Sequence, residues 1–194
     1  MSLVHIDALQ SKMRDCDICG DLPLGPNPLF KIDEKTRILI AGQAPGRITH
    51  KKGVPFDDPS GDRLRAWMGI SRAAFYDDPR IGILPMGFCF PGGGKSGDLA
   101  PRPECAPQWR ARALAAMPDI AFTIVIGRHA MDWHFPDQKR ATLTDVVRAN
   151  GDLQDHVVLP HPSPRNNIWL KRNPWFAVDV LPKLQSRVSA LLQP

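Results

Sequence analysis

Four short runs of apolar and β-branched residues predict four buried strands. They cover 37–41, 81–84, 121–126 and 157–159, and each is followed by a glycine or a proline. The stretches between them carry apolar residues at helical spacing. Strands that alternate with helices in this way predict an α/β fold, in which a mostly parallel sheet is covered by helices on both faces.

The helices are predicted from apolar spacing together with capping residues. Ser60 is expected to cap a helix that begins near Gly61. Asn173 and Pro174 are expected to start the last helix, which Pro182 should bend or break. Further helices are indicated by Ile6, Leu9 and Met13, by Trp109, Leu114 and Met117, by a start near His129, and by a cap at Thr142 or Thr144. The stretches 47–59 and 90–107 are expected to be loops.

The composition is that of one folded domain. The chain has 194 residues, of which 43% are hydrophobic and 23% charged, and no linker, internal repeat or low-complexity tract divides it. Its 20 prolines and 15 glycines indicate many shaped loops, and such loops commonly carry function. We therefore expect a single domain over 1–194.

The net charge and the N-terminal residues limit the classes of protein to which the chain can belong. There are 25 Lys and Arg residues against 20 Asp and Glu, a formal net charge of +5, which suits a polyanionic partner without requiring one. The first residues lack a basic stretch followed by a long apolar one. No window approaches the roughly 18 apolar residues that span a bilayer. We expect a cytoplasmic protein with no membrane partner.

The four cysteines are the residues whose type and spacing suggest a metal site. Cys16 and Cys19 form a C-x2-C pair, and Cys89 and Cys105 follow far along the sequence. In a reducing compartment thiols are seldom paired as disulfides. Four sulfurs can hold zinc or an iron–sulfur cluster, although four unrelated small apolar side chains are the alternative. A metal site here would tie down the N-terminal segment 1–30.

Polar groups gather where the predicted strands end. The run from His161 to Asn167 follows the last strand and brings a histidine, a serine, an arginine and two amides onto a proline-stiffened loop. In parallel sheets, ligands bind at this edge. We therefore expect the stretches 42–46, 56–62 and 161–167 and the Cys89 loop to be neighbours.

Gly94-Lys95-Ser96 ends like a phosphate-binding P-loop, but the pattern fails on both sides. Cys89 stands where the first glycine is required. Downstream, Gly97 and Pro101 prevent the helix that must follow. The sequence therefore argues against nucleoside triphosphate hydrolysis and favours a basic loop near a polyanion.

Three motifs together resemble the uracil-DNA glycosylase superfamily. The stretches 42–46 (GQAPG) and 161–166 (HPSPRN) are similar to its two active-site motifs. The stretch 53–56 (GVPF) and the four cysteines resemble its iron–sulfur-containing bacterial and archaeal branch. The resemblance runs from about Cys16 to Trp175. It implies a three-layer α/β/α sandwich around a four-stranded parallel sheet, in agreement with the strand pattern.

The resemblance also implies roles for particular residues. His161 would donate a hydrogen bond to the departing base. The turn with Gly42, Gln43, Ala44 and Gly46 would bind the pyrimidine carbonyls, and Phe56 would stack on the flipped base. Contacts to the DNA strand would come from Ser163, Arg165 and Asn166, and a [4Fe–4S] cluster, or zinc instead, would be held by Cys16, Cys19, Cys89 and Cys105.

Three departures from the family pattern leave the chemistry open. The best-known members have an aspartate where this chain has Ala44, so either the reaction relies on stabilisation of the leaving group and on the phosphates of the DNA, or another acid positions the water. Asp58 is our candidate for that acid, ahead of Asp57 and Asp62. Gly46 replaces a bulky tyrosine, which predicts tolerance of larger bases.

The third departure concerns reading of the base. The family's base-reading asparagine has no counterpart in 84–88, and His50 is an unassigned polar group nearby in sequence. Trp169 and Trp175 are interpreted as packing residues.

The predicted function is hydrolysis of uracil, and of other deaminated or 5-substituted bases, from single- or double-stranded DNA by a monomeric enzyme. The alternatives are a damaged-base binding module without turnover and a hydrolase of free nucleosides.

Overall fold

The computed structural model describes residues 6–95, 97–150 and 153–193. Four parallel strands form the central sheet: β1 (Ile38–Ala41), β2 (Ile81–Ile83), β5 (Phe122–Ile126) and β6 (His156–Leu159), in the order β2-β1-β5-β6. In the register, Ile40 pairs with Ile83 on one side and with Ile124 on the other. The prediction of an α/β fold built on a four-stranded parallel sheet is confirmed.

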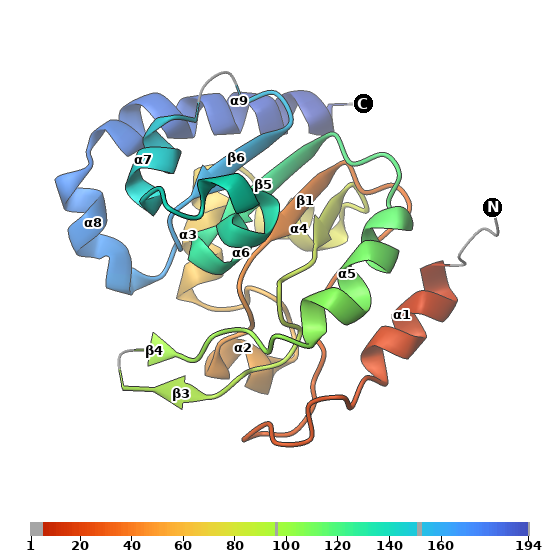
Figure 1. Cartoon of the computed structure of the whole chain (residues 1–194). Coiled ribbons are helices and arrows are strands. Elements are labelled where there is room, and N and C mark those ends of the chain that lie inside the picture. Colours follow the sequence, from red (N-terminus) through yellow and green to blue (C-terminus); the bar gives the residue numbers. More distant parts are fainter. Residues whose placement is uncertain (1–5, 96, 151–152, 194) are drawn as a thin grey trace.

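Helices cover both faces of this sheet (Figure 1). In the view shown, α5 and α6 lie in front of the strands and α3 and α4 behind them. The last helix, α9, packs on α3. The helices are α1 (Ile6–Arg14), α2 (Arg47–Lys52), α3 (Pro59–Met68), α4 (Arg72–Asp77), α5 (Cys105–Ala115), α6 (Gly127–His134), α7 (Leu143–Arg148), α8 (Asn167–Arg172) and α9 (Leu181–Leu192), with 3-10 turns at Pro136–Gln138 and Pro164–Asn166 and a π-helical stretch at Phe176–Val180.

Two apolar clusters hold the layers together. The larger one joins strand residues such as Ile40 and Ile124 to Leu64 of α3 and Leu184 of α9, all fully buried. The second packs α1 and α5 on the other side, with Leu39 of β1 at its centre. Each fully buried aliphatic side chain contributes about 1.5–3 kcal/mol, so the layered core fixes the positions of the strand ends.

Both edges of the sheet are covered. Lys31 forms an antiparallel bridge with Ile83, so the N-terminal segment lies along β2. On the other edge, the side chain of Asn150 accepts a hydrogen bond from the N–H of Val158 and donates one to its carbonyl. These contacts occupy backbone groups of both edge strands that would otherwise be free to pair with another chain.

Several local predictions were wrong. The N-cap of α3 is Asp58, whose carboxylate accepts the Gly61 N–H at 2.9 Å, and not Ser60. Pro59 explains the difference, because proline favours the first helical position and places the cap one residue before it. The predicted loop 47–59 contains α2, and α4 was not predicted. Within 90–107 the chain forms a small hairpin, β3 (Gly93–Gly94) with β4 (Gly97–Asp98), and α5 already starts at Cys105.

Other local predictions are confirmed. Thr142, rather than Thr144, caps α7. The predicted disturbance at Pro182 takes the form of a π-helical stretch that runs directly into α9 without a break, because proline has no N–H to donate to the preceding turn. No helix in the described part of the chain is long and apolar enough to cross a membrane.

Candidate active site

A cavity of about 1000 Å³ lies at the carboxyl edge of the sheet. We call it the main cavity. It is lined by Leu29, by 42–49, 55–56 and 58–60 after β1, by Ile83 at the end of β2, by Pro85 and Phe90 after β2, by 93–95 and 97–99 in and beside the hairpin, and by His161 and 163–166 after β6. The loops predicted to meet here do meet, except that Cys89 borders a separate hollow.

The turn after β1 forms the floor of the main cavity. The carbonyl oxygens of Gly42 and Gln43 accept the N–H groups of Met86 and Gly87, which joins this turn to the loop after β2. The N–H groups of Gln43 and Ala44 donate no hydrogen bond to any other described residue. Unpaired amides at a cavity wall are suitable donors for carbonyl oxygens of a ligand.

Phe56 presents its ring to this floor. A Cβ atom on Gly42 would lie 3.3 Å from the Phe56 ring, so a side chain at position 42 would crowd the ring. On its other side the ring meets Phe75 edge-on, with centroids 6.3 Å apart. The half-buried ring thus has packed neighbours and also lines the cavity, an arrangement in which a flat ligand can stack on it.

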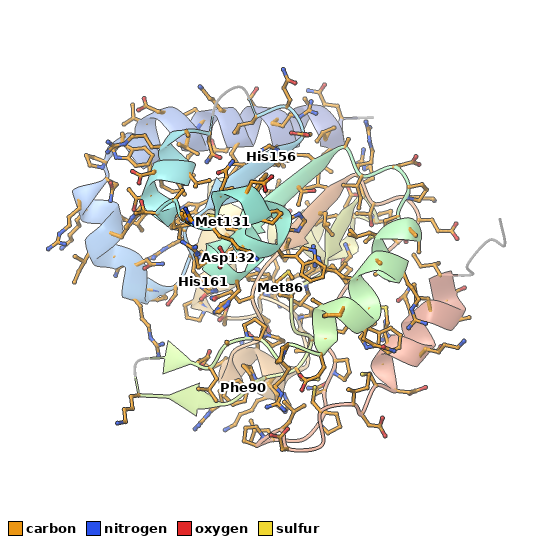
Figure 2. The ribbon with its side chains drawn as sticks, in the orientation of Figure 1. Met86, Phe90, Met131, Asp132, His156 and His161 are labelled. Atoms are coloured by element: carbon orange, nitrogen blue, oxygen red, sulfur yellow. The ribbon has the colours of Figure 1, made fainter. Side chains whose placement is uncertain are left out.

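His161 follows β6 and points into the same region (Figure 2). Its Nδ1 atom accepts the backbone N–H of Ser163 at 3.2 Å, which places the proton of the neutral ring on Nε2. Burial lowers the pKa of His161 below its ordinary value, although the carboxylates of Asp58 and Asp98 act in the opposite direction. The ring is therefore neutral near pH 7 and has one N–H to donate.

Two carboxylates line the main cavity. Asp58, predicted from sequence, uses one oxygen to cap α3, so its orientation is fixed by the helix. Asp98 was not predicted; it comes from β4, and its Oδ2 atom lies 3.2 Å from the place of a Cβ on Gly46. The acids set aside in favour of Asp58 form ion pairs instead, Asp57 with Lys52 and Arg72, and Asp62 with Arg65.

The loop after β6 is held by hydrogen bonds within the loop and by hydrogen bonds from α3. Asn166 donates its amide N–H to the carbonyl of His161 at 2.7 Å, and the Ser163 hydroxyl accepts the Arg165 N–H. Arg63, which the sequence did not single out, donates to the Ser163 carbonyl at 3.1 Å and to the Asn167 side chain at 2.8 Å. Ser163 and Asn166 thus shape the loop that carries His161.

Arg165 closes one side of the cavity mouth. Its guanidinium lies against the backbone of Gly97, so the loop after β6 touches the hairpin here. Lys95, at the hairpin, also lines the cavity, and the stretch around it is a hairpin and not the start of a helix, which confirms the rejection of a P-loop. Ser96 lies outside the described residues. Lys95, Arg165 and Arg47 thus place positive charge at the described cavity wall, which suits phosphate groups.

The family model described as the uracil DNA glycosylase superfamily matches residues 30–185. The chain belongs to the uracil DNA glycosylase superfamily. A similar solved structure is the solution NMR structure of a candidate uracil DNA glycosylase from Methanosarcina acetivorans. It is 18% identical, covers 84% of this chain and 94% of its own, and has a TM-score of 0.47.

The four cysteines line one small hollow of about 20 Å³ on the side of the α1 and α5 layer. Membership of the superfamily does not establish what this hollow binds. Within residues 6–95, 97–150 and 153–193, no three His, Cys, Asp or Glu side chains are arranged to hold a metal ion. Metal binding therefore stays a prediction.

We call the hollow lined by the four cysteines the sulfur hollow. Its side chains nevertheless have the chemistry that a metal–thiolate group requires. No other ligand type lines the hollow, which is bordered by Cys16, Cys19, Cys89 and Cys105. The Trp109 indole N–H donates to the Cys16 sulfur at 3.2 Å and the Asn27 N–H to the Cys89 sulfur at 3.4 Å, as outer hydrogen bonds to ligating thiolates do. Burial raises the pKa of the Cys105 thiol to about 12, so a thiolate there requires a nearby cation.

The remaining sequence candidates lie outside the cavity. His50 is buried in α2 beside Phe90 and does not border the cavity. Trp169 and Trp175 pack edge-on against Phe176 at the large cluster, which confirms their interpretation as packing residues. The described acids at the cavity wall are Asp58 and Asp98.

Proposed function

We propose that the protein is a monofunctional DNA glycosylase that removes uracil, and larger deaminated or 5-substituted bases, to leave an abasic site. The observation that supports this most directly is the neutral His161 ring, oriented by Ser163 with its N–H available at a cavity floored by Phe56 and the 42–46 turn. Membership of the superfamily supports the glycosylase class.

The chemistry follows from these positions. A base must leave the stack to reach the cavity, at a cost of a few kcal/mol. When the bond between sugar C1′ and base nitrogen breaks, its electron pair goes to the base, and the base oxygen becomes negative. A hydrogen bond from His161 Nε2 to that oxygen lowers the barrier by about 3 kcal/mol.

Water then adds to C1′, and the proton that it loses ends on the released base anion, which becomes the neutral base. In our proposal Asp58 orients this water and stabilises the positive sugar, while the backbone N–H groups of Gln43 and Ala44 hold the base carbonyls. Arg165 binds the phosphates of the strand, beside a loop shaped by Ser163 and Asn166. One protein molecule has room for one flipped nucleotide, and we propose a monomer acting on DNA.

We also propose that the sulfur hollow holds a [4Fe–4S] cluster with a structural role. The four cysteines come from the N-terminal segment, the loop after β2 and the start of α5, so a bound cluster would join these three segments. It takes no part in bond cleavage in this proposal. Zinc in its place is the alternative that metal analysis separates.

A matched histidine pair tests the proposed function. His161 and His156 lie at opposite ends of β6 (Figure 2), and only His161 borders the main cavity. A labelled uracil oligonucleotide is incubated with each variant and then treated with alkali. His161→Ala should slow strand breakage at least 100-fold, whereas His156→Ala should match the native protein. Tight binding without breaks favours a binding module, and activity confined to nucleosides favours a nucleoside hydrolase.

A further inference from the structure

Phe56 is held in a strained backbone conformation. Its φ of 55° lies in the left-handed region, and it is the only non-glycine residue in the described part of the chain with a positive φ. Such a conformation costs on the order of 1–3 kcal/mol in a residue with a bulky side chain, and it persists only where surrounding contacts fix it. The contacts that fix Phe56 are therefore part of the site.

Three neighbours fix the backbone at this point. Arg65 of α3 donates to the Phe56 carbonyl at 3.2 Å, and the Tyr76 hydroxyl of α4 donates to the Pro55 carbonyl at 2.9 Å. A Cβ on Gly61 would lie 1.6 Å from the Phe56 carbonyl oxygen, so this oxygen occupies space that any other residue at position 61 would fill.

The two donors also hold each other. Arg65 is only 5% exposed, and it donates to the Tyr76 oxygen at 3.3 Å and to Asp62 at 2.5 Å. Its guanidinium lies over the Phe75 ring at 5.3 Å from the centroid, and the Phe75 ring meets Phe56 edge-on. One connected network therefore fixes both the carbonyl and the ring of Phe56.

We propose that Arg65 and Tyr76 are positioning residues that hold Phe56 as a rigid platform for the planar ring of a flipped base. The inference rests on the proposed function, since it assumes that a base enters the main cavity. A platform fixed before binding pays little ordering entropy when the base arrives. Loss of the network should therefore weaken base binding while leaving contacts to the DNA strand intact.

The test combines two variants with a double-mutant cycle. Tyr76→Phe keeps the ring and removes the hydroxyl; Arg65→Met keeps the aliphatic stem and removes the donors. Affinity for free uracil and the single-turnover rate of base release are measured, with affinity for an oligonucleotide carrying a reduced abasic site as the readout that lacks a base. Tyr76→Phe, which removes the hydrogen bond to the Pro55 carbonyl, should reduce the first two quantities about fivefold. Arg65→Met, which removes three hydrogen bonds, should reduce them further, and abasic-site affinity should be unchanged in both variants.

The cycle separates positioning from general destabilisation. In a Phe56→Ala background, Tyr76→Phe should have no further effect, because residues that act through one ring are not additive. Thr144→Val, which removes the acceptor of the Trp169 indole N–H away from the cavity, is the matched control and should match the native protein.

Each outcome decides between the two proposals. If Tyr76→Phe and Arg65→Met match the native protein, or reduce abasic-site affinity as much as uracil affinity, the positioning role is wrong. If the native protein releases no base yet binds uracil through Phe56 and Tyr76, the proposed enzyme is wrong and the platform stands. A native protein that neither releases nor binds a base overturns both.

Discussion

The backbone N–H of Ser163 donates to Nδ1 of His161 at 3.2 Å, and this one contact sets which nitrogen of the ring can serve a ligand. With Nδ1 occupied as an acceptor, the neutral ring carries its proton on Nε2. The Asn166 amide holds the carbonyl of the same histidine, so the tautomer and the ring orientation depend on the loop around it. The short motif thus fixes the proton that the proposed chemistry needs.

The rate of base release should depend weakly on pH across the ordinary range for histidine. Burial lowers the pKa of His161, so its neutral form persists below the ordinary value of 6.5. Single-turnover rates measured from pH 8 downwards should stay level through 6.5 and fall only at lower pH. A rate that halves close to 6.5 would show that His161 titrates as an exposed histidine does.

Stability should fall with acid because of a second half-buried histidine, His134. His134 accepts a hydrogen bond from the Arg110 guanidinium at 2.7 Å, and burial followed by the charge of Arg110 lowers its pKa to about 4. Between pH 6.5 and 4 the unfolded chain binds a proton that the folded one does not. The free energy of unfolding should therefore fall by up to about 3 kcal/mol over this window.

Urea unfolding at pH 8 and pH 5 measures this loss. His134→Gln keeps a hydrogen-bond acceptor without a titrating ring, and should lose less stability between the two pH values than the native protein does. The exposed His129→Gln is the control and should retain the native difference, since His129 is not among the groups that lower the His134 pKa. If His134→Gln and the native protein lose the same free energy of unfolding between pH 8 and pH 5, His134 is not the cause of the loss.

Substrate range should depend on Gly46. A Cβ at this position would lie 3.2 Å from the Asp98 carboxylate, so a larger side chain must move Asp98 or enter the cavity. Gly46→Tyr should process 5-substituted uracils about 10–200-fold more slowly relative to uracil itself, the range expected when a pocket discriminates by one small group. The ratio of kcat/KM values for the two bases is the measurement. An unchanged ratio would mean that Gly46 does not limit base size.

Purified protein should contain iron and inorganic sulfide in equal amounts and absorb broadly in the visible range. Cys89→Ala should lose both and unfold at a lower temperature, since metal binding contributes to folding. Trp109→Phe, which keeps an aromatic ring and removes the N–H bound to the Cys16 sulfur, should retain the metal. A colourless protein that contains zinc would contradict the cluster and keep the four-sulfur site.

The sequence predicted the strands well because buried parallel strands are short β-branched runs with clear stops. It also placed the His161 loop and the 42–46 turn at one edge, since parallel strands end on the same side. The cap of α3 was open to prediction as well: Asp58 precedes Pro59, and proline at the first helical position marks the residue before it.

Residues that act through tertiary contacts carried no such signal. Asp98 enters the cavity only because a two-residue hairpin returns it there, and Arg63 and Arg65 look like ordinary charges on an amphipathic helix. α2 was missed although Gly46 precedes it and Gly53 ends it at a φ of 70°, because its six residues are mostly polar. Short polar helices depend on their caps, which periodicity does not detect.

The hairpin that brings Asp98 to the main cavity is carried by a segment whose ends, Cys89 and Cys105, both border the sulfur hollow. A chain segment fixed at two points has fewer conformations available to its tip, and the cost of ordering the tip grows slowly with the length between them. With the proposed cluster bound at these two ends, the wall of the main cavity would therefore be tied to the sulfur hollow. Damage to the thiols would change the shape of a site that contains no cysteine.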